Sequence, residues 1–422
     1  MSNETNIADI CIVGGGLTGL MMGVALAHTP YRVALLDKSD GIAPAPDGRT
    51  TTIHAAGQRM LTALGVWDEL TLAPTAIHGI QVMVGDAVTG LKARQKRAFD
   101  LEWTTTESPM GYVVDNGDLF RALLNVLSTH VANGNVKHVT GCFIANMTHQ
   151  AGRAVLQVDS SNEVSMRCDL VVGCDGGNSQ LRAGAGLRQI RESQLPGHRA
   201  QTAIVATMRL ETDHNHTAFQ RFLPGGPLAL MPLNGRLASL VWTLPSVDAE
   251  RLLDASEDEF NSACTMAFGP TLGFLALDGP RLKWMLKPAI STRMTRQNLV
   301  LAGDAAHALH PLAGQGYNLA LGDAAILADA LTAAHQCGLA AGHSTMRTNY
   351  ENKRRVEVTA MSSATTALNL LFSDKTKAVN SLLGLGMGVL NATPLKSIFS
   401  KLAQGGTLAR ASLLDGKLPG QN

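Results

Sequence analysis

The sequence predicts an α/β fold, because short apolar runs typical of buried strands end in glycine turns that lead into helical segments. Three such runs span residues 10–13, 170–174 and 299–302, and each is followed at once by Gly, Asp-Gly or Gly-Asp. Strands that alternate with helices in this way form an open parallel sheet. A further group of strand-like runs between residues 187 and 279 predicts a second sheet.

Composition excludes several classes of protein. Of the 422 residues, 45% are apolar and 16% are charged, which predicts a large buried core. The net charge is +1 and Lys or Arg never form a run of five, so the electrostatic footprint of a nucleic-acid binder is missing. Six scattered cysteines without a C-x-x-C pattern indicate a reduced, cytosolic chain rather than disulfides or zinc. We expect no signal peptide, and no membrane-spanning helix, since no apolar run reaches about 18 residues.

The first glycine turn has the spacing G-x-G-x-x-G. Gly14 permits the tight turn, Gly16 lets a pyrophosphate approach the backbone, and Gly19 lets the following helix pack closely on the strand. The free N–H groups of that helix favour an anion. Asp37 ends the next strand-like run, 23 residues after Gly14, where an acid can hold ribose hydroxyls. The stretch therefore predicts a dinucleotide site, although it does not separate NAD from FAD.

Two further strand ends carry an aspartate. Asp175 and Gly176 follow the run 170–174, and Gly303 and Asp304 follow the run 299–302. An Asp-Gly pair is often only a turn. An aspartate at the carboxyl end of a parallel strand, however, lies where open α/β sheets bind ligands, and it can accept hydrogen bonds from a sugar-like chain.

An extended turn precedes the most regular helix of the sequence. Pro311 restricts the backbone of His310, and Gly314 and Gly316 permit conformations that other residues avoid. Apolar residues recur at helical spacing after the turn, so we predict a helix that begins near Asn318. The start of this helix carries the positive end of the helix dipole, so it would stabilise negative charge on a bound group.

These motifs, in this order, resemble those of the single-component flavoprotein aromatic hydroxylases. Within that group, "HPLAGQGYNLALGDAAILADAL" and "FLPGGPLALMPL" are similar to the ubiquinone-biosynthesis hydroxylases of the octaprenyl-methoxyphenol hydroxylase type, FAD monooxygenases that act on polyprenylated phenols. The resemblance extends from residue 10 to about residue 405. It implies a Rossmann-like FAD-binding domain interleaved with a β-sheet substrate domain and followed by a helical C-terminal segment.

The expected division of the chain follows from the positions of the motifs. The FAD-binding domain is expected in three parts, residues 1–76, 107–186 and 280–346. The substrate domain is expected in two parts, residues 77–106 and 187–279. Residues 347–422 form the helical C-terminal segment, which either packs on the flavin domain or contacts a membrane or partner enzymes.

The resemblance implies tightly bound, non-covalent FAD. Asp37 would hold the ribose, Asp304 the ribityl chain, and residues 311–316 would follow the edge of the isoalloxazine. The full expected set is Gly14, Gly16, Leu17, Thr18, Gly19, Asp37, Lys38, Arg49, Asn116, Asp175, Gly176, Gly303, Asp304, Pro311, Gly314, Gln315, Gly316 and Asn318.

The implied reaction is hydroxylation of a polyprenylated phenol with O2 and NAD(P)H through a flavin hydroperoxide. The cofactor carries the oxidising chemistry, so we predict no catalytic side chain, with His310 as the one acid/base candidate. His307 and His310 lack a carboxylate cluster at ligand spacing, which favours a structural or flavin-lining role over metal binding. His214 and His216 lie in a polar stretch and are expected to be solvated.

Other functions stay open at this point. A flavoprotein of the same fold could be a prenyl reductase, or a hydroxylase of another aromatic; a halogenase is disfavoured because no W-x-W-x-I-P run occurs. A flavin-binding scaffold of a biosynthetic complex is the alternative from a different class. The predicted location is cytoplasmic, with peripheral contact to the inner membrane as the alternative.

Overall fold

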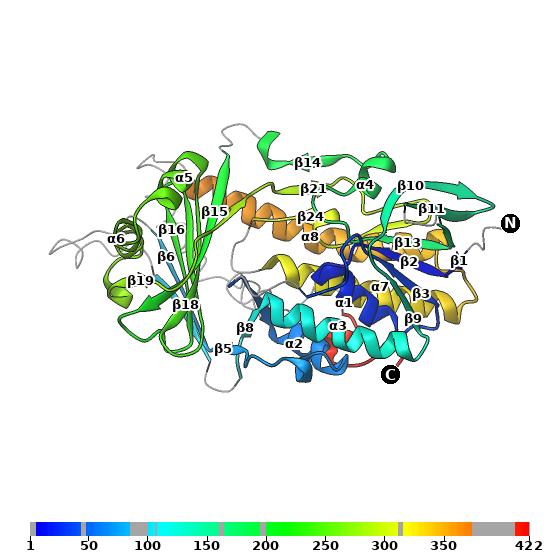
Figure 1. Ribbon diagram of the computed structural model, residues 1–422, viewed down its shortest axis with the longest axis horizontal. Helices are drawn as coiled ribbons and strands as arrows, with labels where there is room; N and C mark the ends of the chain where they lie inside the picture. Colours follow the sequence, from blue (N-terminus) through cyan, green and yellow to red (C-terminus); the bar gives the residue numbers. More distant parts are fainter. Residues whose placement is uncertain are drawn as a thin grey trace.

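The computed structural model describes residues 6–43, 48–84, 100–105, 108–159, 164–194, 200–310, 315–373 and 410–421. Two main sheets lie at opposite ends of the molecule, and the long helix α8 runs between them (Figure 1). The chain has the expected α/β fold, with a Rossmann-like unit interleaved with a second, largely antiparallel sheet.

The first sheet is parallel except at one edge, where β22 and β23 are antiparallel. Its three central neighbours, β23, β13 and β2, are the strands expected from the apolar runs. In spatial order the sheet contains β22 (Thr295–Arg296), β23 (Leu299–Leu301), β13 (Leu170–Gly173), β2 (Ile10–Val13), β3 (Val33–Leu36) and β9 (Val136–Val139).

Helices cover this sheet and bury the largest hydrophobic core. Helices α3 and α7 both pack on α1, and α8 packs on α7. These helices are α1 (Leu17–Leu26), α3 (Asn116–Ala132), α7 (Gln315–Gln336) and α8 (Ser344–Ser373), and α4 (Gln180–Gly184) follows the strand β13. Helix α7 is described from Gln315, three residues before the predicted start.

The second sheet has seven strands in one path, and β20 pairs with its strand β15. All its strands are antiparallel to their neighbours except the parallel pair β16 and β6. In order they are β19 (Leu275–Leu277), β15 (Gln201–Leu210), β18 (Leu237–Pro245), β17 (Gly226–Pro232), β16 (Thr217–Leu223), β6 (Gly79–Val84) and β7 (Asp100–Thr104), with β20 at Leu282–Met285.

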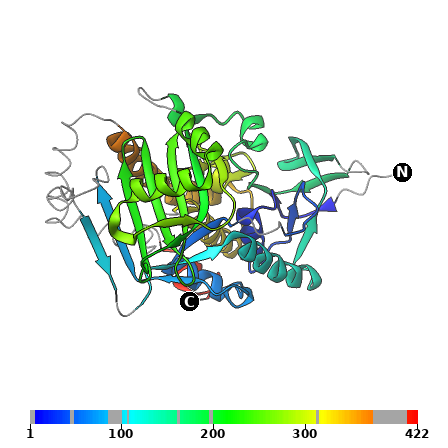
Figure 2. The ribbon, with the colours of Figure 1, turned by 60° about the vertical axis from the view of Figure 1, so that its left-hand side comes forward.

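The two faces of the second sheet have different surroundings. Its outer face, which includes Phe219 and Leu240, packs under α5 (Ser246–Asp254) and α6 (Glu257–Phe268). We call the opposite face, which includes Ala218 and Ala229, the inner face. It packs against Ile77 and Val113 of a small sheet, β4 (Thr50–His54), β8 (Gly111–Asp115) and β5 (Thr75–Ile77), on the side of the first sheet (Figure 2).

Two smaller sheets complete the described strands. One contains β1 (Asn6–Ile7), β12 (Val164–Cys168), β11 (Arg153–Asp159) and β10 (Phe143–Gln150). The other contains β14 (Gln189–Arg191), β21 (Ala289–Ser291) and β24 (His307–Ala308).

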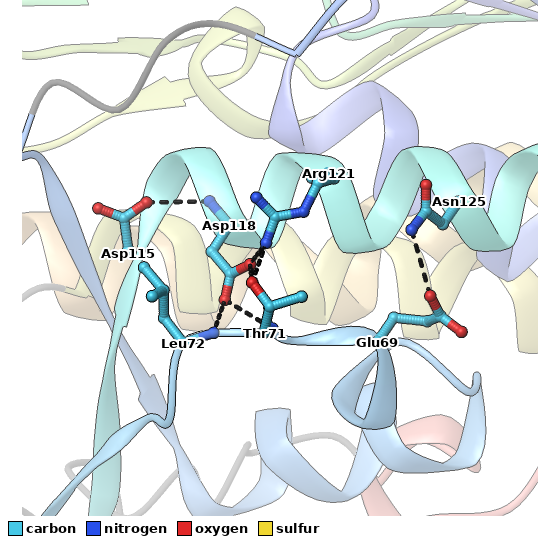
Figure 3. A network of polar contacts seen from close by, with 7 residues as sticks. All are labelled: Glu69, Thr71, Leu72, Asp115, Asp118, Arg121 and Asn125. Atoms are coloured by element: carbon cyan, nitrogen blue, oxygen red, sulfur yellow. Dashed lines mark hydrogen bonds and ion pairs between the residues drawn. The ribbon is translucent and has the colours of Figure 1, made fainter.

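A buried carboxylate fixes the start of α3. Asp118 accepts hydrogen bonds from the backbone N–H groups of Thr71 at 3.1 Å and Leu72 at 2.8 Å, and the Arg121 guanidinium pairs with it (Figure 3). Asp115 caps the helix by accepting a hydrogen bond from the Asp118 N–H at 2.9 Å. The first residue of α3, Asn116, is therefore held in place by its neighbours on both sides.

The C-terminal end of the chain returns to the first sheet's helices. Helix α8 carries the chain from α7 toward the strands β16 and β17. Residues 410–421 pack on α2 (Ala55–Ala63), where Arg59 donates to the Leu414 carbonyl at 3.2 Å, and on α7, where Asp329 accepts from the Ser412 N–H. The run "SLLGLGMGVL" lies outside the described residues. None of the described helices has the length and apolar character needed to cross a membrane.

Candidate functional site

The first glycine turn is built for close approach. Gly14 has φ +106°, and a Cβ there would lie 2.5 Å from the Cys174 carbonyl oxygen. A Cβ on Gly19 would lie 1.7 Å from the carbonyl oxygen of Gly14, so no other residue fits between α1 and the turn. A Cβ on Gly16 would meet nothing within 4 Å. The backbone at the start of α1 is thus open on the side where an anion would bind.

The electrostatics of this helix start also suit an anion. No side chain caps α1, and its first turn, which contains Leu17 and Thr18, carries no acidic residue. Its free N–H groups and the positive end of the helix dipole therefore have no counter-charge from their own helix. A phosphate group matches both properties.

Asp37 lies directly beside the glycine turn. A Cβ on Gly15 would lie 2.0 Å from the Asp37 Oδ2 atom, so the carboxylate reaches the turn. Ser39 donates its backbone N–H to Asp37 Oδ1 at 3.2 Å and its hydroxyl to Asp37 Oδ2, so each oxygen keeps a further lone pair for a sugar hydroxyl. Lys38, the next residue, is exposed.

The second and third motifs are joined by one arginine. Arg182 is buried and donates to the carbonyl of Ala305 at 2.7 Å and to that of Gly177 at 2.8 Å. Asp175 Oδ2 accepts hydrogen bonds from the backbone of α4, while its buried Oδ1 atom has no hydrogen-bond partner. Gly303, at φ +57°, lies against the side chain of Thr18, since a Cβ there would come within 2.8 Å of it. The three motifs therefore meet at one edge of the sheet.

Asp304 has an unusual environment for an aspartate. Its side chain is open to solvent, yet protein surrounds it closely enough to raise the pKa of its carboxyl by desolvation, an effect that His307 partly offsets. Because the side chain is exposed, a ligand can reach its carboxylate oxygens. A carboxylate in such a position can accept hydrogen bonds from a bound polyol.

A fully buried network holds the backbone of Gly303. Asp323 Oδ2 accepts from the Gly303 N–H at 2.8 Å and pairs with His307 Nε2 at 2.7 Å. Its other oxygen accepts from Arg354 Nε at 2.7 Å, and that guanidinium also pairs with Glu357. Burial alone would raise the pKa of Asp323, but His307 and Arg354 hold it below its usual value.

Sequence reasoning missed this network. The available signal was an aspartate, Asp323, within the otherwise apolar helix "NLALGDAAILADAL", since a buried acid requires a cation. Nothing in the sequence pointed to Arg354, which lies 31 residues later on another helix.

At the expected flavin edge, Arg49 and Asn116 are neighbours. The Asn116 N–H donates to the Arg49 carbonyl at 3.0 Å, and the Arg49 guanidinium lies 5.5 Å from the ring centroid of Trp284 on β20. The buried Oδ1 atom of Asn116 has no hydrogen-bond partner. Arg49 therefore reaches from the small sheet to the second sheet.

Asn318 is used differently from the other expected residues. Its side-chain amide donates to the Thr52 carbonyl at 2.7 Å and accepts from the His54 N–H at 3.1 Å, so it fastens α7 to β4. Gln315 and Gly316 open α7. Pro311 and Gly314 lie outside the described residues.

Of the four histidines singled out in the sequence, three are buried, and His216 is exposed as expected. His307 is paired with Asp323, and His310 Nε2 lies 2.7 Å from a carboxylate oxygen of Glu192, with both side chains buried. The expectation that His214 is solvated is wrong, because it is 4% exposed and its ring bonds to the Leu233 carbonyl at 2.8 Å. Among the residues that the structure describes, no three His, Cys, Asp or Glu side chains are grouped to hold a metal ion.

The residues present fit FAD. The helix start at Gly16 is open, and its own first turn carries no acidic residue, which suits a pyrophosphate. Asp37 and Asp304 offer carboxylate oxygens to the two sugar-like parts. The unpartnered buried oxygens of Asn116 and Asp175 are acceptors that a ligand would satisfy.

Comparison with known proteins agrees with this geometry. Residues 7–365 match the model of a family described as "FAD binding domain". Ubiquinone hydroxylase UbiL of Rhodospirillum rubrum is 37% identical over 408 residues, which cover 94% of this chain and 90% of that protein. Ubiquinone biosynthesis monooxygenase COQ6, mitochondrial, of Homo sapiens is 29% identical, with coverage of 94% and 92%.

Solved structures show the same fold. The p-nitrophenol 4-monooxygenase PnpA from Pseudomonas putida DLL-E4 superposes with a TM-score of 0.71 at 18% identity, covering 96% of this chain and all of that one. The motifs, their meeting point and the relatives agree: this chain belongs to the FAD-binding-domain family and, within it, to the FAD-dependent monooxygenases of ubiquinone biosynthesis.

Proposed function

We propose that this chain hydroxylates the aromatic ring of a polyprenylated phenol in ubiquinone biosynthesis, with O2 as oxidant and NAD(P)H as electron donor. The observation that carries the proposal is the convergence of the three motifs at one sheet edge that faces the inner face of the second sheet. The identity to a ubiquinone hydroxylase supports the same substrate class.

Each part of the site has a role in holding the cofactor. The start of α1 would bind the pyrophosphate, Asp37 the ribose, and Asp304 the ribityl chain. The start of α7, including Gln315 and Gly316, would direct free N–H groups toward negative charge on the ring system, which stabilises such charge by about 0.3–1 kcal/mol. Arg182 and Asp323 would hold the turns after β13 and β23 in place through their hydrogen bonds to Ala305 and Gly303.

The chemistry of oxygen activation belongs to FAD, which when bound takes two electrons from the nicotinamide and passes them to O2. No nucleophilic side chain is then required of the protein. Its own work is to orient the phenol and to exclude water. The His310–Glu192 pair is the described group beside the Pro311 turn that could hold or release a proton.

We also propose that different segments of the chain bind the cofactor and the substrate. Residues 1–76, 107–186 and 280–346 would bind FAD, and residues 77–106 and 187–279 would cover the substrate. Strand β20 (Leu282–Met285) pairs with β15, so we assign it to the substrate part.

The decisive experiment is complementation. The chain is expressed in bacterial strains that each lack one ring hydroxylase of ubiquinone synthesis, and quinone intermediates are measured by mass spectrometry. We expect rescue of one strain with loss of its accumulated intermediate, and FAD in the purified protein. Rescue of none, with FAD bound and no O2 consumed, would favour a scaffold or a reductase over a hydroxylase.

We further propose that residues 347–422 include a contact for the membrane or for partner enzymes, since the substrate class is very apolar. Flotation of the full chain with liposomes of phosphatidylethanolamine and phosphatidylglycerol measures the membrane part directly. A chain that stays unbound, and that also fails to co-purify with other enzymes of the pathway, would contradict it.

A further inference from the structure

Gln220 lies on the inner face of the second sheet. Its neighbour in sequence, Phe219, points to the outer face and stacks edge to face on Phe268 of α6. Because side chains alternate along a strand, Gln220 points the other way. Its partners in the ladders are Ala229 on β17 and Val82 on β6, which are both apolar.

The inner face is the surface that the cofactor half of the molecule meets. Thr50, next to Arg49, donates to the Ser239 hydroxyl on this face at 2.8 Å. Ala229 belongs to the cluster that packs on Val113, and α8 borders β16 and β17. Gln220 therefore lies on the apolar face opposite the expected flavin site.

The amide oxygen of Gln220 is buried without a partner. The side chain is 6% exposed, and its Oε1 atom accepts no hydrogen bond. An unsatisfied buried acceptor destabilises a fold, so a ligand or water is its usual partner. Gln201, on the same face of β15 and 5% exposed, is a contrast because its amide donates to the Gly225 carbonyl at 3.0 Å.

We propose that Gln220 is a specificity-determining residue whose Oε1 atom accepts a hydrogen bond from the ring hydroxyl of the substrate. This inference rests on the proposed function. A phenol O–H is a donor, and a placed acceptor without a protein partner, flanked by apolar residues, is typical of a small-molecule site. A methyl ether of the same ring cannot donate and would leave the acceptor unfilled. Gln220 would thus select rings with a free hydroxyl and fix their orientation.

The test compares a phenol with its methyl ether. Oxidised, FAD-loaded protein is titrated with a prenylated phenol of short tail and with its O-methyl ether, and Kd is read from the flavin absorbance. We expect wild type to bind the phenol about 5–10-fold more tightly, as one hydrogen bond allows. Gln220→Leu should bring the ratio of the two Kd values to about 1 and raise the hydrogen peroxide formed per NAD(P)H oxidised.

Two further measurements separate this role from a structural one. Gln220→Leu removes an unsatisfied acceptor, so its Tm without substrate should equal or exceed that of wild type. The control Gln201→Leu breaks a made hydrogen bond, so its Tm should fall while its Kd ratio stays as in wild type.

The outcomes that overturn the proposal are distinct. If wild type binds the phenol and Gln220→Leu keeps the wild-type ratio, Gln220 does not contact the hydroxyl. If wild type prefers the ether, the amide presents its NH2 group and the assignment is wrong. If wild type binds neither compound while holding FAD, the proposed substrate class fails, and this inference with it.

Discussion

Replacement of Arg354 by methionine should destabilise the protein from the centre of the cofactor half. Arg354 has no exposed side-chain surface and pairs with Asp323 at 2.7 Å and with Glu357 at 2.6 Å. Removal of one partner of a buried ion pair leaves an uncompensated charge, at a cost of about 3–5 kcal/mol. For 422 residues the unfolding entropy is about 0.9 kcal/mol/K, so Tm should fall by about 3–6 °C.

The matched control is the adjacent arginine. Arg355 is half exposed and lies 3.7 Å from Glu351, and it also contacts the Thr292 carbonyl. Because exposed pairs contribute little, Arg355→Met should change Tm by less than about 1 °C. Both variants are measured as apoproteins by circular dichroism, and their affinity for FAD is measured by quenching of flavin fluorescence.

The FAD affinity and the pH dependence carry the sharper expectations. Arg354→Met weakens the hold of Asp323 on the Gly303 N–H, so the FAD Kd should rise about 5-fold, the value of one hydrogen bond. Without the Arg354 cation, the pKa of buried Asp323 is raised. A buried carboxyl with a raised pKa destabilises the folded state once the pH is high enough to ionise it. The Tm gap to wild type should therefore shrink from pH 8 to pH 5.5. Equal Tm losses in both variants, or a gap that widens at low pH, would refute the reasoning.

Three other changes test separate parts of the site. Gly19→Ala should abolish measurable FAD binding, because its Cβ would lie 1.7 Å from the Gly14 carbonyl oxygen; a yellow, FAD-loaded variant would contradict the close packing. Asp304→Asn should raise the FAD Kd about 10-fold, because a neutral amide accepts hydrogen bonds from a polyol more weakly than a carboxylate does; an unchanged Kd would argue against a contact between Asp304 and the cofactor. Burial lowers the pKa of His54 to about 4, so the folded state resists protonation of this ring. From pH 6.5 to pH 5 the free energy of unfolding of wild type should therefore fall by up to about 1.4 kcal/mol per pH unit. Urea unfolding should show a smaller fall for His54→Asn.

The part of the site that could be predicted from sequence is the part made by local backbone geometry. Gly19 is required by its contact with Gly14 within one strand–turn–helix unit, and the glycine spacing records that unit. Gly14 takes the positive φ of the turn, although its close contact is with Cys174 at the end of the neighbouring strand. Asp175 and Asp304 end strands whose apolar runs are visible in the sequence. Neighbouring parallel strands then bring these ends together without further information.

The part that could not be predicted depends on pairing between distant elements. Asn318 has the right position for a flavin contact, yet its amide is bonded to the β4 backbone, more than 260 residues away. His214 stands in a polar stretch, but the fold places its ring under the Leu233 carbonyl. Gln220 carries no motif, and only the pleat of β16 and its burial reveal which face it occupies. No local spacing encodes such contacts.

Buried polar groups in this protein are of two kinds, and the difference gives a test of the whole site. Asp323 accepts hydrogen bonds from Gly303, His307 and Arg354 through both of its oxygens, so the group holds structure. One oxygen each of Asn116, Asp175 and Gln220 is buried and unfilled, as expected of atoms that a ligand completes, although the other oxygen of Asp175 holds the backbone of α4. Loss of the first kind should lower the Tm of the apoprotein, as argued for Arg354. Apolar replacement of an unfilled group should leave the Tm of the apoprotein unchanged or higher. Asn116→Leu should, however, reduce the rise in Tm that FAD produces, and Gln220→Leu should reduce the rise in Tm that the phenol produces. If both kinds of substitution lower the apoprotein Tm alike, the unfilled oxygens are part of the scaffold and not ligand contacts.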